Sequence, residues 1–145
     1  MLVQHILGSK PKGVQFIGTQ ASVSEATQQL GMLRIGALIV SDDGGTSIRG
    51  ILSERDIVRE IGARGAAALS DSVVDIMTAK VQSCLMTDKA EDVLARMTSG
   101  RFRHMPVQDA DGAVLGVISI GDVVKARLDE VQNENSALAD MIRGY

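Results

Sequence analysis

The chain has 145 residues, of which 45% are hydrophobic, and a formal net charge of −3 at pH 7. This size suits one compact domain or two small fused halves, and the negative charge argues against a broad surface for nucleic acid or anionic membrane. No apolar stretch approaches the roughly 20 residues that cross a bilayer, and the N-terminus lacks the basic start of a signal peptide. A single cysteine, Cys84, excludes an internal disulfide and fits a reducing compartment. We therefore expect a cytoplasmic protein.

The first half of the chain predicts a β-α-β-β-α unit. Residues 14–17 are a short strand candidate, and residues 22–33 have capping-box spacing followed by apolar residues at helical intervals. Residues 37–40 and 48–52 are strands on either side of an Asp- and Gly-rich turn, which predicts an antiparallel hairpin. Ser53 then opens a second helix.

The second half predicts the same unit again. Small residues dominate 62–72, which we take as a linker, and residues 81–84 are the next strand candidate before a capped helix. The hairpin strands are residues 104–107 and 114–118. Because Pro106 cannot donate to a ladder, we expect its strand to be an edge, or open to a cleft, at that point.

The two halves are copies of each other. Residues 20–58 align with residues 87–124, and the pattern Gly-x-x-Ser-x-x-Asp at 50–56 falls on 116–122. Repeated units of this size stack because neither buries its apolar face alone. We predict an α+β fold of two units related by a pseudo-two-fold axis, with clefts between them and a helical extension. The expected division is residues 1–65 for the first unit, 66–128 for the second and 129–145 for a C-terminal helix.

The last helical pattern outruns the repeat and continues toward the C-terminus. Its apolar residues recur at steps of three and four, with one asparagine at a core position, as in a heptad seam: Leu128, Val131, Asn135, Leu138 and Ile142. Two interpretations remain open. The helix folds back on its own domain, or it pairs with the same helix of a second chain in a homodimer.

The repeated serine and aspartate admit two interpretations. Ser53 with Asp56, and Ser119 with Asp122, have the spacing of a helix cap, in which both side chains satisfy backbone amides. A helix N-terminus is also an anion site, and a carboxylate one turn in can accept both hydroxyls of a ribose. Because both copies keep the pattern while the residues between differ, we favour a ligand-binding role.

The chain resembles a tandem pair of cystathionine-β-synthase-type (CBS) domains, also called a Bateman module. The resemblance covers the chain from about Val3 to Leu128 and consists of the order and doubling of five stretches, residues 35–40, 50–58, 75–78, 101–107 and 116–125. It implies binding of an adenosine-containing ligand such as AMP, ADP, ATP, NAD or S-adenosylmethionine between the units. It also implies a homodimer in which four units form a flat disk.

The resemblance also implies which residues bind the ligand. The aspartates would hold ribose hydroxyls with the serines beside the sugar or phosphate, and two strands, at 37–38 and 105–106, would sandwich the adenine. Ser83 fits a position near the ribose and base that Phe16 takes in the first copy. The predicted ligand-binding residues are Phe16, Ala37, Ser53, Arg55, Asp56, Ser83, Arg103, His104, Met105, Pro106, Ser119 and Asp122.

Cations for a phosphate are unequally distributed between the copies. Arg103 and His104 lie where the family places basic phosphate ligands, whereas the first copy has Gly36 and Ala37; Arg55 could add charge from beside the first aspartate. The alternative is that these arginines are simply solvated. We expect one good site and one weak or empty site.

We therefore predict a stand-alone regulatory module without catalysis of its own, which senses energy state by binding AMP, or else ATP, ADP or NAD, and needs no metal. The histidines His5 and His104 lack metal-ligand spacing, and Cys84 suits a buried position better than a nucleophile. Expected partners are a second copy and an unidentified regulated protein, with no nucleic acid or membrane. The alternatives are a homodimeric scaffold with ligand-free clefts and an enzyme that acts on a nucleotide.

Overall fold

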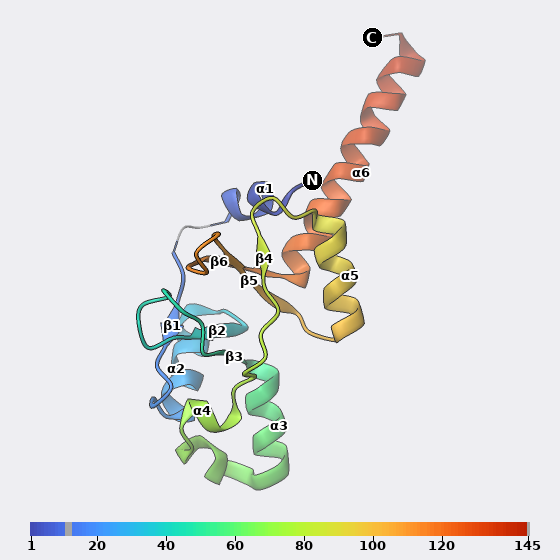
Figure 1. Ribbon diagram of the computed structural model, residues 1–145. Helices are drawn as coiled ribbons and strands as arrows, with labels where there is room; N and C mark the ends of the chain where they lie inside the picture. The colour runs from blue at the N-terminus through green and yellow to red at the C-terminus, as the bar shows by residue number, and fades with distance from the viewer. Residues whose placement is uncertain (11–12, 145) are drawn as a thin grey trace.

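The computed structural model describes residues 1–10 and 13–144. It is the predicted α+β fold, with two three-stranded sheets (Figure 1). The elements of the first half are α1 (Val3–Gly8), β1 (Phe16–Ile17), α2 (Val23–Leu33), β2 (Ala37–Val40), β3 (Gly50–Ser53), α3 (Glu54–Arg64), the 3-10 helix η1 (Gly65–Ser70) and α4 (Val73–Ile76). The second half contains β4 (Cys84–Leu85), α5 (Ala90–Gly100), β5 (His104–Gln108), β6 (Val114–Ser119) and α6 (Ile120–Arg143).

Both sheets have the same topology, which confirms the repeated β-α-β-β-α unit. Their strand orders are β1-β2-β3 and β4-β5-β6, and in each sheet the first pair is parallel and the second antiparallel. The register agrees as well, since Val40 pairs with Gly50 and Val107 pairs with Gly116. The first strand of each unit is only two residues long, shorter than the sequence predicted.

Pro106 lies in β5, the central strand of the second sheet. The parallel ladder with β4 begins only at Val107, opposite Cys84. The missing amide of Pro106 therefore lies just outside that ladder, which agrees with the prediction that the strand is an edge at this point rather than open to a cleft.

Each unit has its own core, and within the aligned parts of the repeat the two cores use equivalent positions. The first consists of Ile17, Val23, Ala26, Leu30, Leu38, Val40, Leu52, Ile57 and Val73. The second consists of Val3, Ile6, Cys84, Ala90, Val93, Met97, Met105, Val107, Ile118 and Val123. Because aromatic residues are scarce, aliphatic side chains and methionine fill both.

The short helices α1 and α4 exchange places between the units. Helix α1 starts the chain but packs Val3 and Ile6 into the second core, while α4 precedes the second unit and packs Val73 into the first core. Backbone hydrogen bonds fix both positions, from Val3 N to Asp88 O at 2.9 Å and from Val73 N to Ala21 O at 2.8 Å. Described residues that follow each helix lie between the units: Lys10 and 13–15 after α1, and Thr78 and 80–82 after α4.

The predicted linker is ordered. Helix α3 continues to Arg64, and η1 follows with Ala68 fully buried. Arg64 pairs with Glu60 at 3.0 Å and with Asp71, which ties the end of α3 to the start of the next segment.

Helix α6 extends away from the body of the molecule (Figure 1). Leu138 is 57% exposed and Ile142 is 87% exposed, so the interpretation in which this helix folds back on its own domain is wrong. None of the described helices is both long and apolar enough to span a membrane.

Candidate functional site

Two cavities lie between the units, and each is lined by both. Cavity 1 has a volume of about 620 Å³ and is lined by Gly36, Ile51, Ser53, Glu54, Arg55, Asp56, Arg59, Thr78, Lys80, Val81, Gln82, Gly100, Arg101, Phe102, Arg103, His104, Ser119, Ile120 and Gly121. Cavity 2 has a volume of about 820 Å³ and is lined by Gln4, Leu7, Gly8, Lys10, Gly13, Val14, Gln15, Leu33, Arg34, Ile35, Gly36, Ala37, Met86, His104, Leu115, Gly116, Val117 and Ser119. Three residues line both cavities: Gly36, His104 and Ser119.

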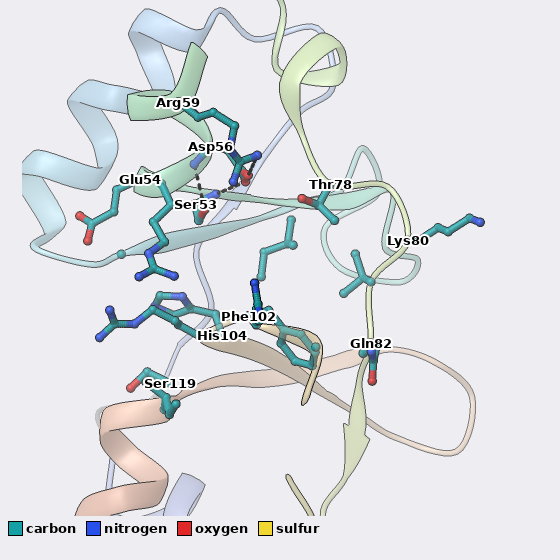
Figure 2. A pocket seen from close by; sticks show the side chains of 18 of the residues that line it. Ser53, Glu54, Asp56, Arg59, Thr78, Lys80, Gln82, Phe102, His104 and Ser119 are labelled. Atoms are coloured by element: carbon teal, nitrogen blue, oxygen red, sulfur yellow. Dashed lines mark hydrogen bonds and ion pairs between the residues drawn. The ribbon is translucent and has the colours of Figure 1, made fainter. Parts of the chain in front are cut away.

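The start of α3 forms one wall of cavity 1. The Ser53 amide donates to Asp56 Oδ2 at 2.9 Å, and the Asp56 amide donates to Ser53 Oγ at 3.2 Å, which is a reciprocal capping box. The capping interpretation is thus confirmed for this pair. Asp56 is 6% exposed, and its other oxygen, Oδ1, lies 3.5 Å from Nη1 of the solvent-exposed Arg59 (Figure 2). One carboxylate oxygen is used by the helix, and the other meets only a long contact with a side chain that can move.

The start of α6 has the same capping box but a different partner for its carboxylate. The Ser119 amide donates to Asp122 Oδ2 at 2.8 Å, and the Asp122 amide donates to Ser119 Oγ at 3.1 Å. Lys10 Nζ donates to the same Oδ2 at 2.6 Å and to the Val117 carbonyl at 2.8 Å. Lys10, which follows α1, therefore occupies the carboxylate of the second aspartate.

The ion pair also fixes the charge state of Asp122. Burial raises the pKa of Asp122, but the Lys10 ammonium and the Ser119 amide lower it by more, so that its pKa lies below the ordinary carboxyl value. Asp122 is ionised at neutral pH and is already paired. A ribose that needed this carboxylate would have to displace the lysine.

Cavity 1 is rich in cations. Its basic lining residues are Arg55, Arg59, Lys80, Arg101 and Arg103, against two acidic ones, Glu54 and Asp56. The basic residues that line cavity 2, within the part of the chain that the structure describes, are Lys10 and Arg34.

Position 103 is the clearest difference between the copies. Arg103 lies beside cavity 1, and the equivalent residue of the first unit is Gly36. Arg101 and its equivalent Arg34 both end a helix with a left-handed backbone, at φ of 56° and 54°. A positive φ is uncommon for arginine, and at both positions it turns the backbone at the edge of a cavity.

His104 lies between the two cavities. Its ring is so close to Gly36 that a Cβ on that glycine would lie 3.0 Å from both Cε1 and Nε2. Burial lowers the pKa of His104 and is the largest effect; Glu54 and Asp122 act in the opposite direction, and Lys10 and Arg103 lower the pKa further. The ring is therefore neutral near pH 7, in a position where added negative charge would favour its protonation.

Figure 2 shows how the two units face each other across cavity 1. Ser53, Asp56 and Arg59 lie on the α3 side, and His104 and Ser119 lie opposite. The cavity therefore sets a carboxylate and a helix start on one wall against a histidine and a second helix start on the other.

The structure brings together six of the twelve residues that the sequence predicted as ligand contacts. Ser53, Arg55, Asp56, Arg103, His104 and Ser119 all line cavity 1. Ala37 lines cavity 2, and Asp122 lies behind Lys10 beside that cavity.

The other four lie outside the lining of both cavities. Met105 is fully buried in the second core, and the adjacent Pro106 is buried with its carbonyl 3.7 Å from Cys84 Sγ. The Phe16 ring packs over Gly45, and the Ser83 carbonyl accepts a hydrogen bond from Arg96 Nη2 at 2.8 Å. Sequence reasoning missed other residues that do line cavity 1, namely Arg59, Thr78, Lys80, Gln82 and Phe102.

The residues that the structure describes contain no group of three or more His, Cys, Asp or Glu side chains able to hold a metal ion. Cys84 is buried, and burial raises the pKa of its thiol to about 11, so that the thiolate is scarce at neutral pH.

The CBS domain family model matches residues 12–63 and residues 73–129, one match for each unit. This chain belongs to the CBS domain family. It is a tandem CBS pair, and cavities 1 and 2 are the spaces between its two CBS units.

Similar proteins agree with that assignment. A CBS-domain protein from Agrobacterium tumefaciens has 41% identity and a TM-score of 0.82, over 88% of this chain and 99% of its own. A CBS domain protein from Pyrobaculum aerophilum, solved in complex with AMP, has 25% identity and a TM-score of 0.71, over 84% of this chain and 89% of its own. A mitochondrial CBS domain-containing protein of Arabidopsis thaliana is 35% identical over 129 residues, which are 87% of this chain. The chain spans 62% of the length of that relative, and less of the next two curated relatives.

Proposed function

We propose that this chain is a regulatory module that binds one adenine nucleotide per chain in cavity 1, with AMP as the preferred ligand. The observation that carries the proposal is the arrangement in cavity 1 of a helix-start carboxylate, Asp56, among several basic side chains. A nucleoside phosphate has the complementary pattern, hydroxyls that donate hydrogen bonds and a phosphate that accepts them.

The ribose is the part of the ligand that Asp56 fits. Two adjacent hydroxyls donate to a carboxylate, and Asp56 Oδ1 has only the 3.5 Å contact with Arg59 to give up. Since Arg59 is largely exposed, the cost of displacing it is small. The Ser53 hydroxyl lies beside Asp56 in the same wall of cavity 1.

The phosphate would be bound by Arg103, with Arg55 and His104 near it. Arginine binds a phosphate through two parallel N–H donors. His104 starts neutral and gains a proton when a phosphate dianion lies nearby, because the negative charge stabilises the imidazolium.

Cavity 2 is proposed to be the weaker site. Its aspartate, Asp122, is held by Lys10 at 2.6 Å. In the first unit the residue equivalent to Arg103 is Gly36, which has no charged side chain. A nucleotide bound in cavity 2 would either lack a free carboxylate for its ribose or have to break the ion pair between Lys10 and Asp122.

The solved relative from Pyrobaculum aerophilum that is complexed with AMP supports this ligand class. We further propose that the module works as a homodimer and that occupancy of cavity 1 reports the energy state to a protein that it regulates. Ligand binding can shift the arrangement of the units only by its difference in affinity for the two arrangements.

Isothermal titration of the purified protein with AMP, ATP and NAD tests the proposal. We expect AMP to bind with a stoichiometry of one per chain and to raise the unfolding temperature. Absence of binding by all three at millimolar concentration would overturn the nucleotide proposal and favour the scaffold with ligand-free cavities. Chromatography of the recovered AMP serves as the check on catalysis, with unchanged AMP expected.

A further inference from the structure

Helix α6 leaves an apolar seam uncovered along most of its length. The α6 seam consists of Val124, Leu128, Val131, Asn135, Leu138 and Ile142, which follow each other at alternating steps of four and three. All five apolar members are exposed. Val124 and Leu128 lie where α6 still contacts the second unit, through Arg127 and Glu91, whereas Leu138 and Ile142 lie on the part of α6 that extends away from the body (Figure 1). A monomer would gain nothing from exposing such a seam to water.

We propose that the α6 seam pairs in parallel and in register with the seam of a second copy, and so sets the two CBS pairs head to head. This inference rests on the homodimer proposed above and specifies its orientation. In heptad terms Val124, Val131 and Leu138 take the d positions. Leu128, Asn135 and Ile142 take the a positions.

Asn135 decides between the parallel and antiparallel arrangements. In a parallel pair each layer places an a position against the same a position of the partner, so the two Asn135 amides meet and satisfy each other. In an antiparallel pair each a position packs against a d position, and every d position of this seam is apolar. The antiparallel arrangement would bury the asparagine amide without a partner, which costs on the order of 1–3 kcal/mol for each unsatisfied group.

The residues beside the seam permit the parallel arrangement. In that register Arg127 faces Gln132 of the partner subunit, and Glu134 faces Ala139 of the partner subunit. No like charges oppose each other. Arg127 is in addition held by Glu130 of its own chain at 3.1 Å, which keeps its charge neutralised.

The first unit carries an apolar face at the equivalent place. Val58 in α3 aligns with Val124 in α6 and is 68% exposed, and Ile61 lies one turn further along. Both border a groove between α2 and α3 with a volume of about 580 Å³. Because α6 runs away from both units at one end (Figure 1), a parallel pair of α6 helices places the two bodies at the same end.

Cysteine cross-linking tests the orientation. We expect the single variants Leu128→Cys and Ile142→Cys each to form covalent dimers on mild oxidation, because each cysteine meets its own copy. Positions 128 and 142 are about 21 Å apart along a helix at 1.5 Å per residue, so a mixture of the two variants should give no mixed dimer between differently tagged chains. Asn133→Cys, on the opposite face of α6, is the matched control and should not cross-link. The native Cys84 is buried and stays out of the reaction.

In the antiparallel register that aligns the whole seam, position 128 meets position 138 of the partner, an a position against a d position. Mixed dimers between Leu128→Cys and Leu138→Cys chains, without self-cross-linking of either, would overturn the parallel arrangement. Light scattering adds the assembly state: the wild type should have the mass of a dimer and Leu138→Lys that of a monomer. A monomeric wild type would overturn the inference. Because the seam lies outside both cavities, AMP binding by Leu138→Lys then reports on the nucleotide proposal separately.

Discussion

Cavities 1 and 2 are built from equivalent positions of the two CBS units, but different cations meet their aspartates. Asp56 faces an exposed arginine at 3.5 Å, and Asp122 is held by a lysine at 2.6 Å. The lysine follows α1, which packs on the second unit and lies outside the aligned residues 20–58 and 87–124. A symmetric fold therefore need not give two equivalent sites, because segments outside the repeat can occupy one of them.

The largest effect is expected from Asp56→Ala. Loss of the ribose acceptor should weaken AMP binding by at least tenfold, since a hydrogen bond to a charged group contributes about 1.5–3 kcal/mol. The fold should survive the lost helix cap, which costs about 1 kcal/mol. Titration calorimetry gives the affinity, and circular dichroism the folded state. The matched control is Asp122→Ala in the other unit. An equal loss of AMP affinity in Asp122→Ala would contradict the proposal that AMP binds in cavity 1 rather than cavity 2.

Arg103→Gly should have the next largest effect. This change copies the residue of the first unit into the second, and we expect AMP affinity to fall about fivefold, less than for a buried charged pair because Arg103 is exposed. Adenosine, which has no phosphate, should bind the variant and the wild type equally. The ratio of the two affinities is the quantity to measure. A similar loss for adenosine would mean that Arg103 does not bind the phosphate.

A smaller effect is expected from pH. His104 is neutral near pH 7 because burial lowers its pKa. Its protonated form adds positive charge next to the phosphate, so AMP should bind a few-fold more tightly as the pH falls from about 7.5 to about 5.5. The groups that face this ring are Glu54, Lys10, Arg103 and Asp122. In His104→Gln the dependence should flatten, apart from the titration of the AMP phosphate itself. An unchanged profile would place the pH response elsewhere.

The smallest effect is expected from Lys10→Met. The change frees Asp122, and we expect a second, weak AMP site to appear in calorimetry. Stability should fall by no more than about 1 kcal/mol, the usual range for a partly exposed pair. The folded-state pKa of Asp122 is lowered, so this contribution exists above its unfolded pKa and is lost as the pH falls through the folded value. Binding that stays at one AMP per Lys10→Met chain would mean that Lys10 does not close cavity 2.

The repeat explains why most of the fold could be predicted. Equivalent apolar residues such as Leu52 and Ile118 occupy equivalent core positions, and the spacing of Ser53 and Asp56 encodes the cap that the structure contains. The alternation of side chains along a strand also separates two of the predicted site residues. Met105 lies on the opposite strand face from His104, so one of them had to point into the core.

The rest depends on contacts that no local pattern contains. Helix α1 could not be assigned to the second core from Val3 and Ile6, since an apolar residue does not specify which core it enters. Lys10 reaches Asp122 across more than a hundred residues of sequence. The domain division expected from the sequence and the cytoplasmic location both stay predictions.

A crystal structure of the protein grown with AMP is the most direct test of the central claim, that the nucleotide binds in cavity 1 through Asp56. We predict density for AMP in cavity 1, with the ribose hydroxyls on Asp56 and the phosphate near Arg103, while Lys10 still contacts Asp122. Nucleotide in cavity 2 with Lys10 displaced and cavity 1 empty would contradict the claim.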